Sequence, residues 1–298
     1  MDVLVRVGQR IVDCHLSITA AGVAFYALLA TFPGLLVLAG LYGLLFDRQQ
    51  MREQLQFLEG QLAPEATNLL VAFVGGLVGA DRGGVGLGIA GGAVVTLWGA
   101  SLGVRALIRA LNLAYGEAEK RSFVARSGLA LAMTLGAIAV VFCLGAVLMS
   151  VPIVTHWVQP GQALQRLVFY ARWPVVALLF WLSLFVFYRY GPSRARPRWS
   201  WVSWGALLAT AMWLAGTGIL AWYVASSPRY HQLYGSVGII VLVLAWFLLS
   251  AFSVLLGAAL NAELERQTRQ DTTIGSARPP GARGATAADT VGDSVQTP

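Results

Sequence analysis

Six long apolar stretches, each nearly free of charge, set the strongest limit on how this chain can fold. They cover residues 18–46, 86–103, 127–151, 173–190, 202–225 and 237–260. A run of about 18 or more apolar residues forms a helix that can cross a hydrocarbon core about 30 Å thick. A buried helix of a soluble protein explains one such run, but not six. The sequence therefore predicts an all-α, polytopic membrane protein with six transmembrane helices.

The basic residues are distributed unevenly between the gaps that separate these stretches. Counted over alternate gaps, 15 of the 21 Lys and Arg residues fall on one side of the implied membrane. Cytoplasmic loops retain Lys and Arg, so both termini are expected in the cytoplasm. The same loops face anionic lipid headgroups, which accounts for the net charge of +7 without nucleic acid as a partner.

The first 17 residues are expected to form a short helix in the inner membrane interface, ahead of a six-span domain over residues 18–266. Leu4, Val7 and Ile11 recur at helical spacing, and the polar residues between them occupy other faces. A helix with one apolar stripe and one charged face is typical of a segment that lies along a membrane surface.

Two further segments stand outside the spans. Residues 47–85 are too polar to span a membrane, but their leucines recur at helical spacing, which predicts two amphipathic helices in the first external loop. Residues 267–298 are rich in Thr, Gly, Ala, Pro and Asp. Such a composition offers little apolar surface to bury, so a disordered cytoplasmic tail is expected there.

The second span is rich in glycine, and the first contains a proline. Gly88 and Gly92, and then Gly99 and Gly103, form two small-xxx-small pairs 11 residues apart, on one face of a helix. Such a face allows another helix backbone to approach closely. The sharper alternative is a mobile helix beside a substrate path. Pro33 removes one hydrogen bond from the first span and predicts a kink.

A basic polar stripe follows the second span. Arg105, Arg109 and Asn112 are spaced four and three residues apart, so they share one helical face. One interpretation is that these arginines anchor the helix at the inner surface. The other is a binding site for phosphate or another anionic headgroup at the cytoplasmic leaflet.

The end of the sixth span carries a second polar group. Asn261 and Glu265 stand about one helical turn apart, and Glu263 lies on another face. An acid near hydrocarbon is costly unless a cation compensates its charge. We therefore hypothesise that Glu263 or Glu265 pairs with Arg105 or Arg109.

Tyr234 and Gly235 close the external loop before the sixth span. An aromatic belt at the membrane interface explains the tyrosine, and a turn explains the glycine. A gating role for this pair is the alternative.

Signals of enzymatic chemistry are weak. His15, His156 and His231 are scattered, without the spacing of a metal site, and no base–acid pair is assembled. We expect no catalytic residues, no metal and no cofactor.

Five stretches together resemble the YihY/virulence factor BrkB family of bacterial inner-membrane proteins. They run from Ala21 to Pro33, Leu97 to Gly116, Tyr188 to Pro192, Tyr234 to Gly238 and Leu256 to Arg266. The resemblance implies six spans with cytoplasmic termini in a bacterial inner membrane. Members were long labelled ribonuclease BN, a label now regarded as mistaken.

The resemblance also implies associations with serum resistance and with envelope lipid traffic. We therefore expect a transporter or flippase of an anionic lipid or other amphiphile, involved in envelope homeostasis. A non-catalytic scaffold for envelope assembly is the alternative, and a membrane-bound hydrolase a more remote one. Membrane lipids are the expected partners, with envelope-assembly proteins and further copies of this chain as alternatives.

Overall fold

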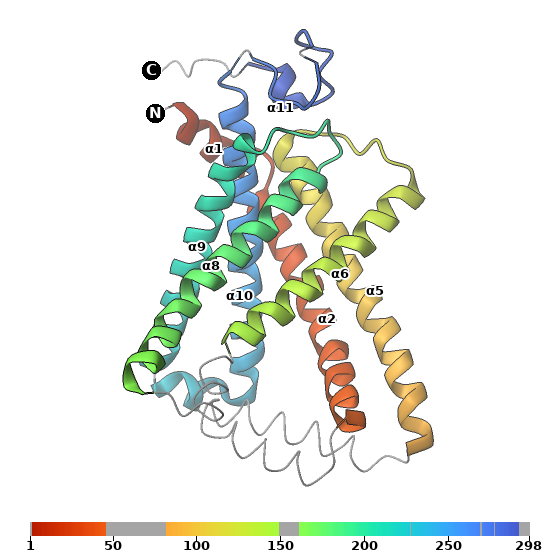
Figure 1. Ribbon diagram of the computed structural model, residues 1–298, viewed down its shortest axis with the longest axis vertical. Coiled ribbons are helices and arrows are strands. Elements are labelled where there is room, and N and C mark those ends of the chain that lie inside the picture. The colour runs from red at the N-terminus through yellow and green to blue at the C-terminus, as the bar shows by residue number, and fades with distance from the viewer. Residues whose placement is uncertain are drawn as a thin grey trace. The chain divides into compact units, whose positions relative to one another are not determined.

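The computed structural model describes residues 2–45, 82–148, 161–226, 228–268, 270–276 and 278–291 of the chain. Within these residues the chain is helical, apart from loops and one isolated bridge between Pro197 and Thr273. The helices are α1 (Asp2–Asp13), α2 (Leu16–Leu45), α5 (Arg82–Tyr115), α6 (Phe123–Leu148), α8 (Gln162–Tyr190), α9 (Ser200–Ser226), α10 (Pro228–Glu265) and α11 (Thr286–Asp289) (Figure 1).

Most of these helices are long and apolar enough to cross a membrane. Among the described residues, five helices meet this condition by themselves, in α5, α6, α8, α9 and α10. The pair of α1 and the first part of α2, bent by 61° at its break, brings the number of candidate spans to six. The prediction of an all-α, polytopic membrane protein is therefore confirmed.

Two expectations about the external side have different outcomes. The amphipathic helices predicted for 47–85 fall almost wholly on residues 46–81, which lie outside the described residues, and from Arg82 the chain already belongs to α5. The external loop expected at Tyr234 and Gly235 is replaced by helix, because α10 begins at Pro228 and continues through both residues. The side-chain surroundings of Tyr234 and Gly235 lie outside the described part of the chain.

The chain divides into two compact units. Unit 2 comprises Ala24–Gly103 and Ala221–Phe247. In it, the glycine face of α5 packs on α2: a Cβ built on Gly99 would lie 3.6 Å from Ala30, and one on Gly103 would lie 3.6 Å from Tyr26 Cβ. These are ordinary van der Waals distances, so small residues on α5 set how closely the two helices approach.

The other residues of the proline and glycine pattern also lie in helices. Gly92 accepts a hydrogen bond on its carbonyl oxygen from Thr96 Oγ1 at 2.7 Å. Gly88 belongs to α5, and α2 continues as helix through Pro33. The side-chain surroundings of Gly88 and Pro33 are outside the described residues.

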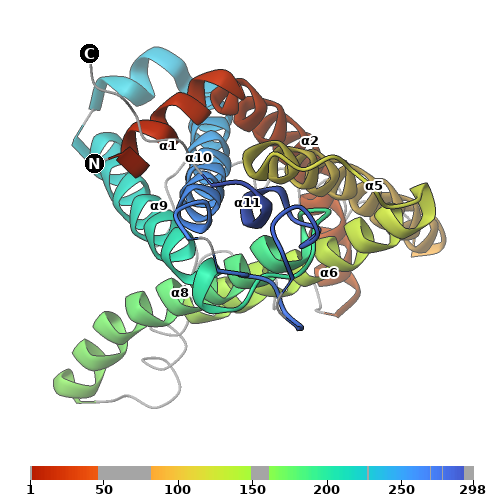
Figure 2. The same cartoon turned by 90° about the horizontal axis from the view of Figure 1, so that it is seen from above.

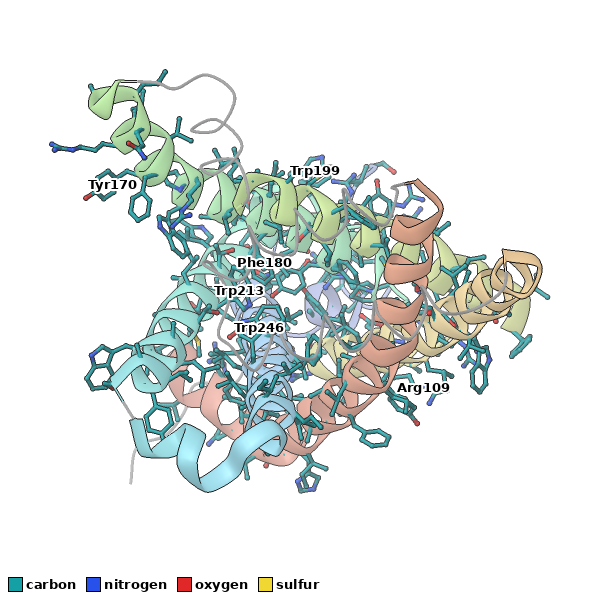
Figure 3. All side chains as sticks on the ribbon, turned by 90° about the horizontal axis from the view of Figure 1, so that it is seen from below. Arg109, Tyr170, Phe180, Trp199, Trp213 and Trp246 are labelled. Carbon is teal, nitrogen blue, oxygen red and sulfur yellow. The ribbon has the colours of Figure 1, made fainter. Side chains whose placement is uncertain are left out.

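Unit 1 comprises Met1–Val23, Val104–Leu220 and Leu248–Pro298, and it holds the main apolar core. The core gathers residues from seven of the described helices, among them Val7, Leu16, Leu111, Tyr188, Ala206, Leu255 and Ala287. Many members are alanines, which allow the helices to approach closely. Between α8 and α9 the Phe180 and Trp213 rings stack with centroids 4.3 Å apart, as Figure 3 shows.

The first helix turns back against this core. The chain breaks at His15, a non-glycine residue with φ of 47°, in the left-handed region, and then continues as α2. Val7 is buried and Ile11 packs on the core, whereas Leu4 is exposed. The apolar stripe expected on 1–17 is thus divided, because the core takes Val7 and Ile11 and leaves Leu4 outside.

The backbones of α9 and α10 approach each other closely where the two helices cross. A Cβ on Gly205 would overlap the carbonyl oxygen of Gly257 and lie 2.5 Å from the Asn261 side chain. A Cβ on Gly257 would overlap the carbonyl oxygen of Gly205 and lie 2.9 Å from Ala209 Cβ. Only glycine fits at either position without a shift of the backbone.

Candidate functional site

The polar residues of unit 1 concentrate at one end, which we call the terminal end. Here α5, α8 and α10 finish, α9 begins, and α1 and α11 lie nearby (Figure 1). The loops at 116–122 and 191–199 and the segment 266–291 also belong to it, and Figure 2 shows α11 over this end. Three of the five sequence stretches that carried the family resemblance, those at 97–116, 188–192 and 256–266, finish here.

A buried ion pair joins α10 to the 191–199 loop. Arg194 donates two hydrogen bonds to Glu265, from Nη1 to Oε2 at 2.7 Å and from Nη2 to Oε1 at 2.6 Å. Thr272 Oγ1 donates a third to Glu265 Oε1 at 2.6 Å, and the Arg194 guanidinium lies 4.9 Å from the Tyr115 ring centroid. Burial alone would lower the pKa of Arg194, but the Glu265 carboxylate raises it above its usual value.

The neighbouring acid, Glu263, is surrounded by three arginines. It accepts hydrogen bonds from Arg6 Nε at 3.1 Å, Arg10 Nη1 at 3.2 Å and Arg266 Nη1 at 3.2 Å. Arg10 Nε also donates to the carbonyl oxygen of Ala114 at 2.6 Å. Burial and the charges of Arg10 and Arg6 lower the pKa of Arg266, although Glu263 opposes them. This cluster ties α1 to the ends of α5 and α10.

Gly116 ends α5 beside the cluster of Glu263 and its three arginines. Its N–H bonds Leu113 O at 3.1 Å, and the N–H of Glu117 bonds Asn112 O at 2.8 Å. This pair of bonds is the Schellman ending of a helix, which places a residue in the left-handed region. Gly116 has φ of 71°, and a Cβ there would lie 2.7 Å from Arg10 Nη2. The positive φ therefore favours glycine here, and the missing Cβ leaves room for the guanidinium of Arg10.

Asn261 holds two helices together rather than serving as a charge partner. Its Oδ1 accepts from the N–H of Gly205 at 2.7 Å, and its Nδ2 donates to Val202 O at 3.2 Å. Both partners lie in the first two turns of α9. The side chain of Asn261 thus links α10 to α9 where the Gly205–Gly257 crossing brings them close.

Asn112 likewise links α5 to two loops of the terminal end by hydrogen bonds. It donates from Nδ2 to Glu119 Oε2 at 3.0 Å and accepts on Oδ1 from the N–H of Ser193 at 2.7 Å. Burial would raise the pKa of Glu119, but hydrogen bonds from Arg121, Ser193 and Asn112 lower it. The buried Asn112 is engaged on both sides and does not present itself with Arg105 and Arg109 as one ligand-binding stripe.

The hypothesised pairing of Glu263 or Glu265 with Arg105 or Arg109 is wrong for the described residues. The two acids find their cations on α1, at Arg266 directly after α10 and in the 191–199 loop. Arg109 is exposed and points outward from α5 (Figure 3), on the opposite face from the buried Leu111 and Ala114. The rotation of α5 about its axis therefore separates its arginines from both acids.

Arg105 lies half-buried one turn before Arg109. Among the described residues its Nε has no hydrogen-bond partner, and neither arginine makes an ion pair. Arg109 is therefore exposed without an ion-pair partner among the described residues, whereas protein atoms cover the Nε of Arg105.

The segment after α10 differs from the disordered tail that we expected. Arg198 N–H bonds Thr272 O at 2.9 Å and Ile274 N–H bonds Arg196 O at 3.0 Å, around the Pro197–Thr273 bridge. Ala287 is fully buried in the main core. The segment has few apolar residues, but backbone hydrogen bonds and small side chains let it pack on a surface that the helices provide.

The segment is also braced by its own charged residues. Arg283 is buried and donates to the carbonyl oxygens of Ala288 at 2.6 Å and Arg278 at 3.1 Å. Asp271 accepts hydrogen bonds from Thr273 and from the N–H of Arg278. Its slight burial would raise the pKa of Asp271, but these bonds lower it to about 2.

Three arginines of the terminal end escaped the sequence reasoning. One feature of the sequence could have predicted that Arg6 and Arg10 act together. Their spacing of four residues places both on one face of a helix. Arg194 had no such signal, because its position depends on how the 191–199 loop folds. No group of three His, Cys, Asp or Glu residues suited to a metal ion occurs among the described residues.

Comparisons with known proteins place the chain among membrane proteins. A family model described as virulence factor BrkB matches residues 7–281, which extends beyond the expected resemblance at both ends. The putative ribonuclease-like protein YfkH of Bacillus subtilis is 28% identical over 84% of this chain and 90% of its own length. UPF0761 membrane protein MS0032 of Mannheimia succiniciproducens is 36% identical over 29% of this chain and 30% of its own length. No solved structure matches the chain.

Proposed function

The chain belongs to the virulence factor BrkB family of membrane proteins, and we propose that it is a transporter or flippase for an anionic lipid or a similar amphiphile. The observation that carries this proposal is the pair Arg105 and Arg109 on one candidate membrane span. Arg105 is half-buried and Arg109 is exposed, and neither makes an ion pair among the described residues.

The position of the pair on α5 suits contact with headgroups. Both arginines lie in the last three turns of the candidate span Gly91–Tyr115. Arg109 is six residues from the end of that span, or about 9 Å at 1.5 Å per residue. A long arginine side chain covers most of such a distance, so its guanidinium can reach the interface while its stem stays in the apolar layer.

The charges of Arg105 and Arg109 favour an anionic ligand that approaches from the surrounding lipid. Glu263 and Glu265 are already engaged by four arginines, two in α1, one directly after α10 and one in the 191–199 loop. An uncompensated guanidinium at the edge of the hydrocarbon layer is costly. A phosphate-bearing headgroup supplies the missing negative charge and fits the fork of an arginine.

The same helix carries the glycine face that packs on α2. A Cβ built on Gly99 would lie 3.6 Å from Ala30, and one on Gly103 would lie 3.6 Å from Tyr26, so the two glycines leave space at this contact. Space between α2 and α5 supports the proposal of a lipid path beside α5.

Leaflet exchange in liposomes tests the proposal. The full-length protein is reconstituted with fluorescent phosphatidylglycerol or phosphatidylcholine, and the fraction quenched from outside is followed over time. We expect accelerated exchange of the anionic lipid, and a rate at least about tenfold lower for Arg109→Ala, because a charged hydrogen bond contributes about 1.5–3 kcal/mol. Lys120→Ala removes an exposed charge of the same end and should keep the native rate.

The opposite results are equally clear. If the native protein accelerates no anionic lipid, the proposal fails and the scaffold alternative takes its place. If Arg109→Ala and Lys120→Ala exchange lipid at the native rate, transport does not use the α5 arginines. The printed name of the Bacillus relative adds one control, which is RNA cleavage by the purified protein.

A further inference from the structure

Arg189 presents a buried positive charge that the helix bundle does not neutralise. It lies in the last turn of α8, and only 8% of the residue is exposed. Its Nε and Nη1 have no hydrogen-bond partner among the described residues. Its nearest recorded companions are aromatic: the guanidinium carbon is 3.8 Å from the Trp199 ring centroid and 5.8 Å from that of Tyr190. Ring faces attract a cation, but they leave its N–H donors unsatisfied.

A second arginine lies on the same tyrosine. The guanidinium carbon of Arg196, an exposed residue, is 5.1 Å from the Tyr190 ring centroid. Within the described part of the chain, neither Arg189 nor Arg196 makes an ion pair. The site therefore carries two positive charges around one aromatic ring.

Four acids of the terminal end have partners other than Arg189 and Arg196. Glu265 is held by Arg194, and Glu263 by Arg6, Arg10 and Arg266. Glu117 accepts from the N–H of Thr286, and Glu119 from Asn112 and Arg121. No acid of the described residues pairs with Arg189 or Arg196, so an anionic ligand can supply their counter-charge.

The surroundings of this pair have the character of a membrane interface. Tyr190 is the last residue of the candidate span Ala163–Tyr190. Trp199 and Trp204, at the start of α9, are 51% and 63% exposed, and Val186 on α8 is 47% exposed. Tyrosine and tryptophan gather at headgroup depth, and exposed apolar residues beside them offer contact to acyl chains.

We propose that Arg189 and Arg196, together with Tyr190 and Trp199, form a binding site for a phosphate-type oxyanion, supplied by the headgroup of an anionic phospholipid or by free phosphate. A guanidinium presents paired N–H donors that match two oxygens of one phosphate. Protein atoms cover Nε and Nη1 of Arg189, so ligand entry requires the Trp199 ring, which lies over the guanidinium, to turn aside. The exposure of Trp199 allows this movement.

Ligand-dependent thermal stability tests the site in the full-length protein, purified in an uncharged detergent. Short-chain phosphatidylglycerol, phosphatidylcholine of equal chain length, and inorganic phosphate are titrated separately at constant ionic strength. Phosphatidylglycerol should raise the Tm of the native protein, whereas phosphatidylcholine should not. Inorganic phosphate that raises the Tm alone identifies free phosphate as a sufficient ligand, and an effect of phosphatidylglycerol only identifies the lipid.

Substitutions locate the effect. Arg189→Gln should weaken the apparent affinity about tenfold or more, which corresponds to the loss of one charged hydrogen-bonded contact. Arg196→Gln should weaken it by a smaller factor. Arg198→Gln removes an exposed arginine of the same loop and should bind as the native protein does.

A second measurement guards against variants that fold poorly. Native mass spectrometry counts bound phosphatidylglycerol on folded molecules only, and Arg189→Lys, which keeps the charge but loses the fork, should retain part of the binding. Equal binding by Arg189→Gln and the native protein would overturn the proposal, as would equal stabilisation by the two lipids. Neither measurement requires transport, so a failure here is distinguishable from a failure of the liposome experiment.

Discussion

At the scale of single residues, Glu263 and Glu265 show how one helix end serves two neighbours. They are two residues apart, so they point to different sides of α10. Glu265 meets Arg194 and Thr272, and Glu263 meets Arg6 and Arg10. The last turn of α10 thereby fixes the 191–199 loop on one side and α1 on the other.

The Arg194–Glu265 pair gives a sharp stability prediction. Glu265→Gln would leave the fully buried side chain of Arg194 without a counter-charge, and such a loss costs about 3–5 kcal/mol. We expect a lower unfolding free energy in detergent, measured by chemical denaturation. The exposed acid Asp13, changed to Asn, should shift it by less than about 0.5 kcal/mol.

A double-mutant cycle isolates the pair itself. Arg194→Met combined with Glu265→Gln removes both charges and should recover much of the loss, because neither ion then remains buried alone. Strictly additive effects of the two single substitutions would contradict the ion pair.

At the scale of elements, the α9–α10 crossing depends on two glycines rather than on a long small-residue motif. Gly205 and Gly257 face each other so closely that a Cβ on either would overlap the other's carbonyl oxygen. Asn261 then bonds across the same gap to Gly205 and Val202. Close approach and hydrogen bonding therefore reinforce each other at one point of the bundle.

A comparison of Gly205→Ala with Gly218→Ala should separate the effect of helix packing on stability from the effect of helix propensity. Gly205→Ala forces the helices apart, and overpacking of this kind costs about 1–3 kcal/mol. Gly218→Ala lies on the same helix with open space around it, so it should be neutral or stabilising by up to about 1 kcal/mol. Thermal unfolding in detergent measures both. A Tm for Gly205→Ala at or above that of Gly218→Ala would contradict the crossing.

Hydropathy alone was sufficient to predict that the long helices exist. It did not predict the residues at which they end. The second apolar run ends at residue 103, but α5 continues to Tyr115. Arg105 and Arg109 interrupt the hydropathy without interrupting the helix, and Gly116 then ends it. Gly205 and Gly257 were not predicted as a pair, because neither has a second glycine four residues away in its own span and only the crossing brings them together.

The ion pairs and the folded residues 270–276 and 278–291 could not be predicted from the sequence for another reason. Glu263 pairs with Arg6 and Arg10 only because the chain reverses at His15, and no local residue signals a left-handed conformation there. The composition of 267–298 describes what that segment can bury by itself. It does not describe the surface that the helices offer to Ala287 or Thr272.

At the scale of the whole molecule, the charge distribution gives a prediction of topology. A chain with six crossings has both termini on the same side of the membrane, and the excess of Lys and Arg predicts that this side is the cytoplasm. Reporter proteins that are active only in the cytoplasm, fused before Met1 or after Pro298, should both be active. The same reporter inserted within residues 47–85 should be inactive.

The two fusions also test the number of spans. An active reporter at one terminus and an inactive one at the other would mean an odd number of crossings. The bent pair of α1 and α2 would then lie along the membrane rather than cross it.

The burial of Ala287 has a consequence for the order in which the protein is made. Ala287 packs in the same core as Val7 and Ala114, although it is translated after α10 and lies past residue 281, where the family model stops. This part of the core therefore stays unfilled while the chain of α10 is being made. The terminal end closes only once Ala287 itself has been synthesised, later than the helices against which it packs.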